Sequence, residues 1–243
     1  MKVIQISGLV TLGLALMAGA AQAVTFTETS DAGETLGDAV SVTAGLSAPL
    51  ESITGVLAGD ADLFKIFLTG GQLFSATTLT GDSLLNLPID ETLGIPIELV
   101  SDPQLFLFDE AGIGVYANDD TFFSAQSALP SMSLSPTESG IYYLGIASND
   151  YDPVSVGGEI FPDEPFTAVL GPTGPGGDAP LEGFAGTSTS SGSYVISLTG
   201  AQVLPATESP TGVPEPATLL GLLALAAFGY RTQRQDSLKT QNS

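Results

Sequence analysis

The sequence predicts an all-β fold, a β-sandwich with one short apolar segment at each end of the chain. Short runs of alternating apolar residues recur between residues 24 and 205, and Gly, Asp and Pro separate them. No long stretch with the 3.6-residue period of a helix lies between the two ends. Many short strands with turn residues between them are typical of a sandwich.

The predicted strands, in chain order, are 52–57, 63–68, 72–77, 104–108, 113–117, 140–147 and 193–200. In the second of these, Phe64, Ile66 and Leu68 share one face. Lys65 lies on the other face, which we therefore place on the outside or at an edge. Residues 109–112 (DEAG) separate two strands and predict a hairpin turn.

Two stretches of the body fit this scheme less well. Residues 81–101 are expected to form an insertion that pairs locally. Residues 151–191 contain GPTGPGGDAP, in which Gly and Pro prevent regular ladders. We expect this second stretch to be a surface loop that caps one end of the sandwich.

The first 23 residues have the pattern of a secretory signal peptide. Lys2 precedes an uncharged apolar stretch, and Ala21-Gln22-Ala23 forms a small-x-small cleavage site. We therefore expect the Sec translocon and signal peptidase as partners, and a mature chain that begins at Val24 outside the cytoplasm. A retained membrane anchor is the alternative.

The predicted mature body, residues 24–213, is strongly acidic. It contains 25 acidic residues and a single basic residue, Lys65, which gives a net charge of −24. Such a charge repels phosphate backbones and excludes nucleic acid as a partner, while it attracts divalent cations. The chain has no Cys and no His. Ser-His and Cys-His nucleophile pairs and the usual zinc sites are therefore excluded, and we expect no enzymatic activity.

Four segments of the body occur in a characteristic order: GVLAGDADLFKIFLTGGQLFSATT, DPQLFLFDEAGIGVYANDD, SPTESGIYYLGIAS and GSYVISLTGA. This order resembles the bacterial pre-peptidase C-terminal domain. The resemblance covers about residues 35–201, interrupted by the two stretches described above. It implies a small jelly-roll sandwich of the kind found on secreted bacterial proteins, often beside a protease but not itself catalytic.

The same resemblance implies a calcium site where an N-terminal acidic segment meets the loop before an Asp-rich strand. The matching positions are Asp31, Asp60 and Asp62. Calcium prefers six to eight oxygen ligands and tolerates irregular loops, which suits these carboxylates. Weaker candidates are two further clusters, Asn118, Asp119 and Asp120, and Asn149, Asp150 and Asp152. For every cluster, the alternative is a turn in which Asp or Asn binds its own backbone.

The C-terminal segment combines Pro214-Glu215-Pro216, an apolar stretch of residues 217–230, and then Arg231 and Arg234. These features resemble the PEP-CTERM sorting signal, which implies processing by an exosortase, a membrane transpeptidase-like enzyme. As a helix the apolar stretch would span about 21 Å, short of a hydrocarbon core of roughly 30 Å. Such a span suits transient insertion in the inner membrane with the arginines on the cytoplasmic side. An ordinary C-terminal anchor is the alternative.

The chain thus divides into a signal peptide (1–23), a sandwich (24–205), a linker (206–213), a sorting segment (214–235) and a cytoplasmic tail (236–243). We expect an exported, non-enzymatic cell-surface or extracellular-matrix protein, with exopolysaccharide as a candidate partner. Two alternatives remain open. One is a module that binds polysaccharide or protein through Tyr142, Tyr143, Tyr151 or the long loop. The other is a secreted hydrolase that uses two carboxylates.

Overall fold

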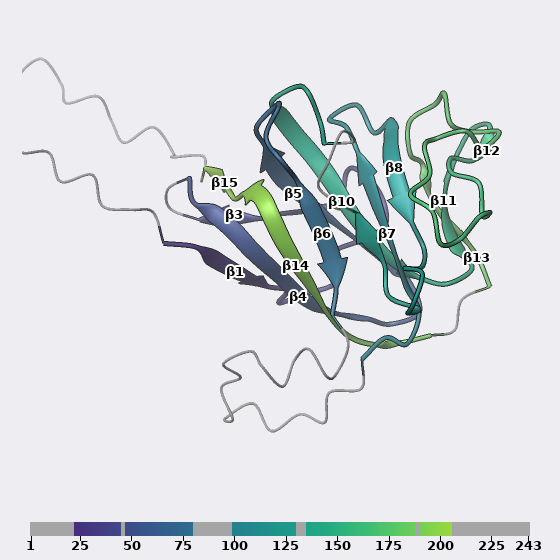
Figure 1. Ribbon diagram of the computed structural model, residues 1–243, viewed down its shortest axis with the longest axis horizontal. Helices are drawn as coiled ribbons and strands as arrows, with labels where there is room; N and C mark the ends of the chain where they lie inside the picture. The colour runs from purple at the N-terminus through teal and green to yellow at the C-terminus, as the bar shows by residue number, and fades with distance from the viewer. Residues whose placement is uncertain (1–21, 45–46, 80–98, 130–134, 188–189, 206–243) are drawn as a thin grey trace, which may run out of the picture. The chain divides into compact units, whose positions relative to one another are not determined.

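The computed structural model describes residues 22–44, 47–79, 99–129, 135–187 and 190–205. The chain divides into two units, residues 1–205 and 206–243, and all of the described residues belong to the first. Within them every regular element is a strand, so the predicted all-β class is confirmed (Figure 1). The predicted signal peptide, apart from Gln22 and Ala23, and the predicted sorting segment lie outside the described residues.

The strands in chain order are β1 (Val24–Thr27), β2 (Val40–Ser41), β3 (Thr43–Ala44), β4 (Pro49–Leu57), β5 (Ala61–Leu68), β6 (Ser75–Thr78), β7 (Pro103–Phe108), β8 (Gly114–Asn118), β9 (Ala128–Leu129), β10 (Gly140–Ser148), β11 (Tyr151–Ser155), β12 (Gly158–Glu159), β13 (Gly183–Gly186), β14 (Gly192–Gln202) and β15 (Leu204–Pro205).

The main sheet has the strand order β1-β4-β14-β5-β10-β7-β8, and β6 pairs with both β14 and β9. β14 joins the two halves of this sheet: most of it pairs with β4, and residues 201–202 also pair with 67–68 of β5. Gly200 lies just before this junction with a φ of 77°. A Cβ there would collide with the backbone oxygen of Leu73, so the close approach of the chain requires glycine.

The main core lies inside this folded sheet. Phe64, Ile66 and Leu68 of β5 are buried in it, as their alternation predicts. Ile53 of β4 and Ile196 of β14 belong to the same apolar cluster. Strands from both halves of the sheet therefore bury their apolar faces together, which is the arrangement of a sandwich.

A second apolar cluster lies on the outer face of β5, β7 and β10. Phe106 of β7 packs against Phe161, with ring centroids 5.9 Å apart, and against Phe184, with centroids 5.8 Å apart. Leu63 and Leu181 are buried in the same cluster. The outer face of the sheet is therefore covered rather than exposed.

The cover comes from residues 151–186, which form the three-stranded sheet β12-β11-β13. The sequence interpretation of this stretch as a surface loop is therefore corrected. Its Gly- and Pro-rich part, 171–180, contains no strand, as predicted. The apolar residues that fix the segment, Phe161 and Phe184, lie outside that part, and their burial holds it on the sheet.

The other predicted strands correspond to β4, β5, β7, β8, β10 and β14, with ends shifted by a few residues. The strand predicted at 72–77 is shorter, because the amide of Phe74 donates to Ser135 Oγ and β6 begins only at Ser75. The predicted hairpin is confirmed between β7 and β8. In its turn, Asp109 Oδ1 accepts hydrogen bonds from the amides of Ala111 and Ile113.

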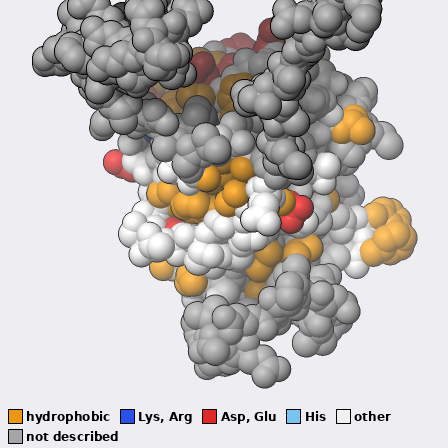
Figure 2. Space-filling view, turned by 90° about the vertical axis from the view of Figure 1, so that its left-hand side faces the viewer, with side chains coloured by type: hydrophobic (Ala, Val, Ile, Leu, Met, Phe, Trp, Pro, Cys, Tyr) orange, Lys and Arg blue, Asp and Glu red, His pale blue; other side chains and the backbone are white. Residues whose placement is uncertain are grey.

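Figure 2 shows the face that lies on the left-hand side of Figure 1. Among the described residues of this face, hydrophobic side chains gather near the middle. Within the described residues no helix is long and apolar enough to cross a membrane.

Residues 81–98 make up most of the predicted insertion at 81–101, and they lie outside the described residues.

Candidate cation-binding sites

Asp62 is a fully buried carboxylate at the start of β5. Its strand position places it on the inner face with Phe64, where an unpaired charge would be costly. Its Oδ2 accepts a 2.7 Å hydrogen bond from the hydroxyl of Tyr194 in β14. Its Oδ1 is buried and has no hydrogen-bond partner among the described residues. Asp62 Oδ1 is therefore able to bind a cation or a proton.

Two more acidic side chains converge on Asp62. Carboxylate oxygens of Glu28, Asp31 and Asp62 lie within 4.8 Å of one another. Glu28 follows β1 directly, and its Oε2 accepts from the amide of Val56 at 3.2 Å. Its Oε1 is buried without a partner, like Asp62 Oδ1. We call Glu28, Asp31 and Asp62 the N-terminal carboxylate site.

The sequence predicted two of these three residues and missed one. Asp31 and Asp62 come together as expected, and Asp60 lies near Asp31, where its charge adds to burial in raising the pKa of Asp31. Asp60 Oδ1 also accepts from the amide of Ala58, which is the turn interaction of the alternative interpretation. Glu28 was missed because its place at the site depends on the pairing of β1 with β4, which the sequence did not predict.

The electrostatics of this site favour a positive ligand. Burial, assisted by the charges of Glu28, Asp60 and Asp31, raises the pKa of Asp62 to about 7, and the Tyr194 hydrogen bond opposes this shift. Burial likewise raises the pKa of Glu28 and of Asp31. A divalent cation bound between the three carboxylates would offset their mutual repulsion and stabilise their ionised forms.

A second acidic site is a cavity of about 310 Å³ at the end of the β7–β8 pair that is opposite to the 109–112 turn. Seven acidic residues line it: Asp102, Asp119, Asp120, Asp150, Asp152, Asp163 and Glu164. Among the described residues no Lys or Arg lines it. We call it the acidic pocket.

The pairing of three strands explains why these residues meet. In the antiparallel pair β7–β8, Leu105 lies opposite Asn118, so the residue before β7 and the residues after β8 share one end. In the pair β10–β7, Ser148 lies opposite Pro103, which brings the end of β10 to the same place. The two weaker clusters of the sequence analysis therefore form one site, and Asp102 joins them.

Asn118 holds this end of the sheet together. Its side-chain amide donates to the backbone oxygens of Asp120, at 2.8 Å, and Ala168, at 3.0 Å. Its Oδ1 accepts from the amide of Ala128 at 2.8 Å. Asn118 is buried and largely engaged with backbone, so it positions the acidic residues that follow it.

Asp119 and Asp120 each retain a buried oxygen, Oδ1, without a hydrogen-bond partner among the described residues. Their carboxylates and that of Asp102 lie within 4.8 Å of one another. Burial, assisted by the charges of Asp120 and Asp102, raises the pKa of Asp119 to about 7. Burial also raises the pKa of Asp152 to about 6, although Gln104 donates a hydrogen bond to it.

The fold and these sites define an acidic all-β protein with no His or Cys for catalysis. Comparison with known families adds one match: residues 212–235 match the PEP-CTERM protein-sorting motif. The motif indicates an exported protein that passes through a membrane, and it implies an exosortase as processing partner. It contains the predicted signal residues Pro214, Glu215, Pro216, Arg231 and Arg234.

Comparison with curated proteins gives no match. Among solved structures, the chain is similar to PliG from Aeromonas hydrophila, a periplasmic inhibitor of g-type lysozyme. The two share 10% sequence identity over 74% of this chain and 100% of PliG, with a TM-score of 0.29. A likeness at this level carries no argument about function.

Proposed function

We propose that this protein is an exosortase substrate, delivered to the cell surface or the extracellular matrix through its C-terminal sorting segment. The observation that carries the proposal is the match of residues 212–235 to the PEP-CTERM sorting motif. In this proposal the apolar stretch 217–230 halts export in the inner membrane. The exosortase then recognises Pro214-Glu215-Pro216 on the outer side.

The order of features in the segment supports processing over permanent anchoring. Pro214 and Pro216 break regular structure and would leave an extended, accessible peptide before the membrane span. A span of about 21 Å needs snorkelling arginines to match a bilayer core of roughly 30 Å. An ordinary anchor needs no proline-flanked acid and is better served by a longer span.

The test replaces Pro214, Glu215 and Pro216 with alanine. Alanine extends helix propensity and removes a charge, so membrane insertion should survive or improve. An epitope within residues 206–212 should appear in the outer membrane or the medium for the native chain, and in the inner membrane for the variant. The same location for both chains would refute the proposed role of the motif.

For the mature sandwich we propose a non-enzymatic role, with exopolysaccharide as a candidate partner. The absence of His and Cys supports this, together with the all-β fold built of strands that resemble the pre-peptidase C-terminal domain. The jelly-roll arrangement is part of the same proposal. A polysaccharide-release assay on purified protein tests it, because reproducible product formation would establish a hydrolase instead.

We also propose calcium as the ligand of the N-terminal carboxylate site. The buried orphan oxygens of Glu28 and Asp62 support a cation there, and the oxygen-only ligand set suits calcium better than a softer metal. A bound ion would connect the segment after β1 to β5, and would fix the N-terminal part of the mature chain on the sandwich.

A further inference from the structure

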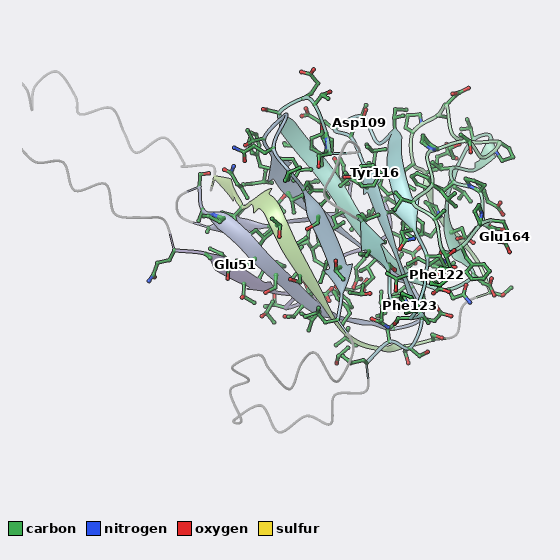
Figure 3. All side chains as sticks on the ribbon, viewed as in Figure 1. Glu51, Asp109, Tyr116, Phe122, Phe123 and Glu164 are labelled. Atoms are coloured by element: carbon green, nitrogen blue, oxygen red, sulfur yellow. The ribbon has the colours of Figure 1, made fainter. Side chains whose placement is uncertain are left out.

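Phe122 and Phe123 are two phenyl side chains held out in solvent beside the acidic pocket. Their exposed fractions are 80% and 93%. Their ring centroids lie 4.9 Å apart in a T-shaped pair. Figure 3 shows both in the lower part of the view, away from Asp109 at the top and from Glu51 at the left-hand side. Two adjacent exposed phenyl rings are a feature of interaction surfaces.

The segment that carries the two rings is shaped by short-range hydrogen bonds. The amide of Thr121 donates to the backbone oxygens of Ser124 and Gln126, each at 3.0 Å. The amide of Ser124 donates back to Thr121 at 3.2 Å. These hydrogen bonds hold the backbone of the turn that presents the two exposed rings.

The phenyl pair is joined to the rim of the acidic pocket. The amide of Asp120 donates to the backbone oxygen of Phe166 at 3.0 Å. Phe166 lines the pocket and is 44% exposed. Asp163 and Glu164, which also line the pocket, are exposed on the same segment as Phe166.

We propose that this surface binds a basic polypeptide, whose Lys or Arg side chain enters the acidic pocket while a neighbouring apolar side chain packs on Phe122 and Phe123. The charge of the pocket selects a cationic group. Asp119 Oδ1 and Asp120 Oδ1 are buried and have no partner within the described part of the chain, so they are acceptors that a guanidinium or ammonium group would satisfy. The exposed ring of Phe166 offers a face on which a guanidinium can stack.

Other occupants fit these observations less well. A second copy of this chain brings a body with a net charge of −24 and only Lys65 as a base, so its approach to the pocket is repelled. Anionic lipid surfaces are repelled for the same reason. A metal ion alone leaves most of a 310 Å³ cavity filled with water and gives no role to the phenyl rings, which do not coordinate calcium.

The proposal goes beyond sorting and is independent of it, because it concerns only residues of the sandwich. The test uses the full chain in a non-ionic detergent and a fluorescent peptide, Gly-Arg-Phe-Gly-Arg-Phe-Gly. Replacing Phe122 and Phe123 with serine should weaken binding about tenfold or more, because exposed aromatic anchors dominate such interfaces. Asp163→Asn with Glu164→Gln should weaken it severalfold and reduce its dependence on salt.

Matched controls separate this surface from general effects. Glu51→Gln with Glu110→Gln removes the same charge elsewhere, and Leu73→Ser with Val156→Ser removes two other exposed apolar side chains. Both pairs should bind within twofold of the native chain. A peptide with citrulline in place of arginine keeps its shape but loses its charge, and should bind at least about tenfold more weakly.

Three results would overturn the proposal. The first is no binding of the arginine peptide at millimolar concentration, or equal binding of the citrulline peptide. The second is complete displacement of the peptide by millimolar calcium with no effect of the phenylalanine substitutions, which would make the pocket a metal site. The third is binding to phosphatidylcholine vesicles that depends on Phe122 and Phe123 while peptide binding does not, which would make the surface a membrane contact.

Discussion

The hydroxyl of Tyr194 in β14 donates a 2.7 Å hydrogen bond to Oδ2 of Asp62 in β5, and both side chains are buried. The bond joins strands from the two halves of the folded sheet, at the edge of the main core. It gives a buried carboxylate one partner and leaves its second oxygen without a partner among the described residues, close to the carboxylates of Glu28 and Asp31. The same contact therefore joins two strands and holds one carboxylate of the N-terminal carboxylate site in place.

The first prediction concerns Tyr194. Tyr194→Phe removes the only described hydrogen bond to Asp62 and should lower the free energy of unfolding by about 2 kcal/mol. Tyr116→Phe is the matched control, because the Tyr116 hydroxyl is buried without a partner among the described residues. Its loss should change stability by less than about 0.5 kcal/mol. Urea unfolding of both variants without metal measures the difference, and equal costs would contradict the assigned role.

The second prediction concerns the bend of β14. Gly200 and Gly71 have similar positive φ values, 77° and 73°. A Cβ on Gly200 would collide with the backbone of Leu73, whereas a Cβ on Gly71 meets nothing within 4 Å. Gly71→Ala should therefore cost about 1 kcal/mol, from the backbone conformation alone, and Gly200→Ala should cost about 3 kcal/mol or more. Denaturant midpoints of the two variants test this, and a Gly200→Ala variant as stable as Gly71→Ala would show that the bend relaxes.

The third prediction concerns calcium. Millimolar Ca²⁺ should raise the Tm of the native chain by mass action, and Mg²⁺ should raise it less because it demands a tighter octahedral geometry. The triple variant Glu28→Gln, Asp31→Asn and Asp62→Asn should lose this difference between the two ions.

A triple variant of equal charge, Glu51→Gln, Glu110→Gln and Asp178→Asn, is the control for calcium, because all three side chains are exposed. It should keep the full response. If both triple variants respond to calcium like the native chain, the effect is general screening of a strongly acidic protein and the site assignment is wrong.

The fourth prediction concerns pH. The pKa values of Asp62 and Asp119 are raised to about 7, and that of Asp152 to about 6, in each case mainly by burial. The folded state therefore holds protons more tightly than the unfolded state, and the metal-free protein should be more stable near pH 5 than near pH 8. This stability is lost as the pH rises from the ordinary Asp pKa of 3.8 through the folded values of about 6 and 7.

Asp119→Asn tests this assignment because it cannot ionise in that range. Its Tm should fall less between pH 5 and pH 8 than the Tm of the native chain, by a few degrees. Glu51→Gln, at an exposed position, should leave the slope unchanged. A slope that both substitutions reduce equally would assign the pH dependence to net charge rather than to the acidic pocket.

Local patterns predicted β4, β5, β7, β8, β10 and β14 of the main sheet, because apolar residues recur within each of these strands. The alternation of Phe64, Ile66 and Leu68 is a period-2 signal that does not depend on distant residues. The turn at 109–112 is equally local, since Asp109 binds the backbone of its own turn. These elements could be predicted from the sequence.

The cover formed by residues 151–186 could not be predicted in this way. Phe161, Leu181 and Phe184 are scattered through a stretch rich in Gly and Pro, and no periodicity connects them. Their burial depends on the outer face of β7, where Phe106 and Phe108 need a partner. A strand with apolar residues on both faces, such as LFLF at 105–108, was the available signal for such a cover.

The candidate sites were predicted only in part, because some of their residues meet through strand pairing between distant parts of the sequence. Asp31 and Asp62 were found by resemblance, whereas Glu28 reaches the site through strand pairing. The acidic pocket was read as two separate clusters, because its members meet only through the register of β7, β8 and β10. The signal for such a site is acidic residues that directly precede one strand and directly follow its antiparallel partner, because these positions lie at the same end of the strand pair.

The most direct test of the sorting proposal is the fate of the residues after Pro216. An epitope within residues 206–212 and a second tag after Ser243 report on the two sides of the processing signal. In the native chain, the form recovered from the outer membrane or the medium should carry the first tag and lack the second, and mass spectrometry should place its C-terminus before the apolar stretch 217–230. A surface form that carries both tags, with the intact C-terminus, would contradict the proposal and show that the segment is only an anchor.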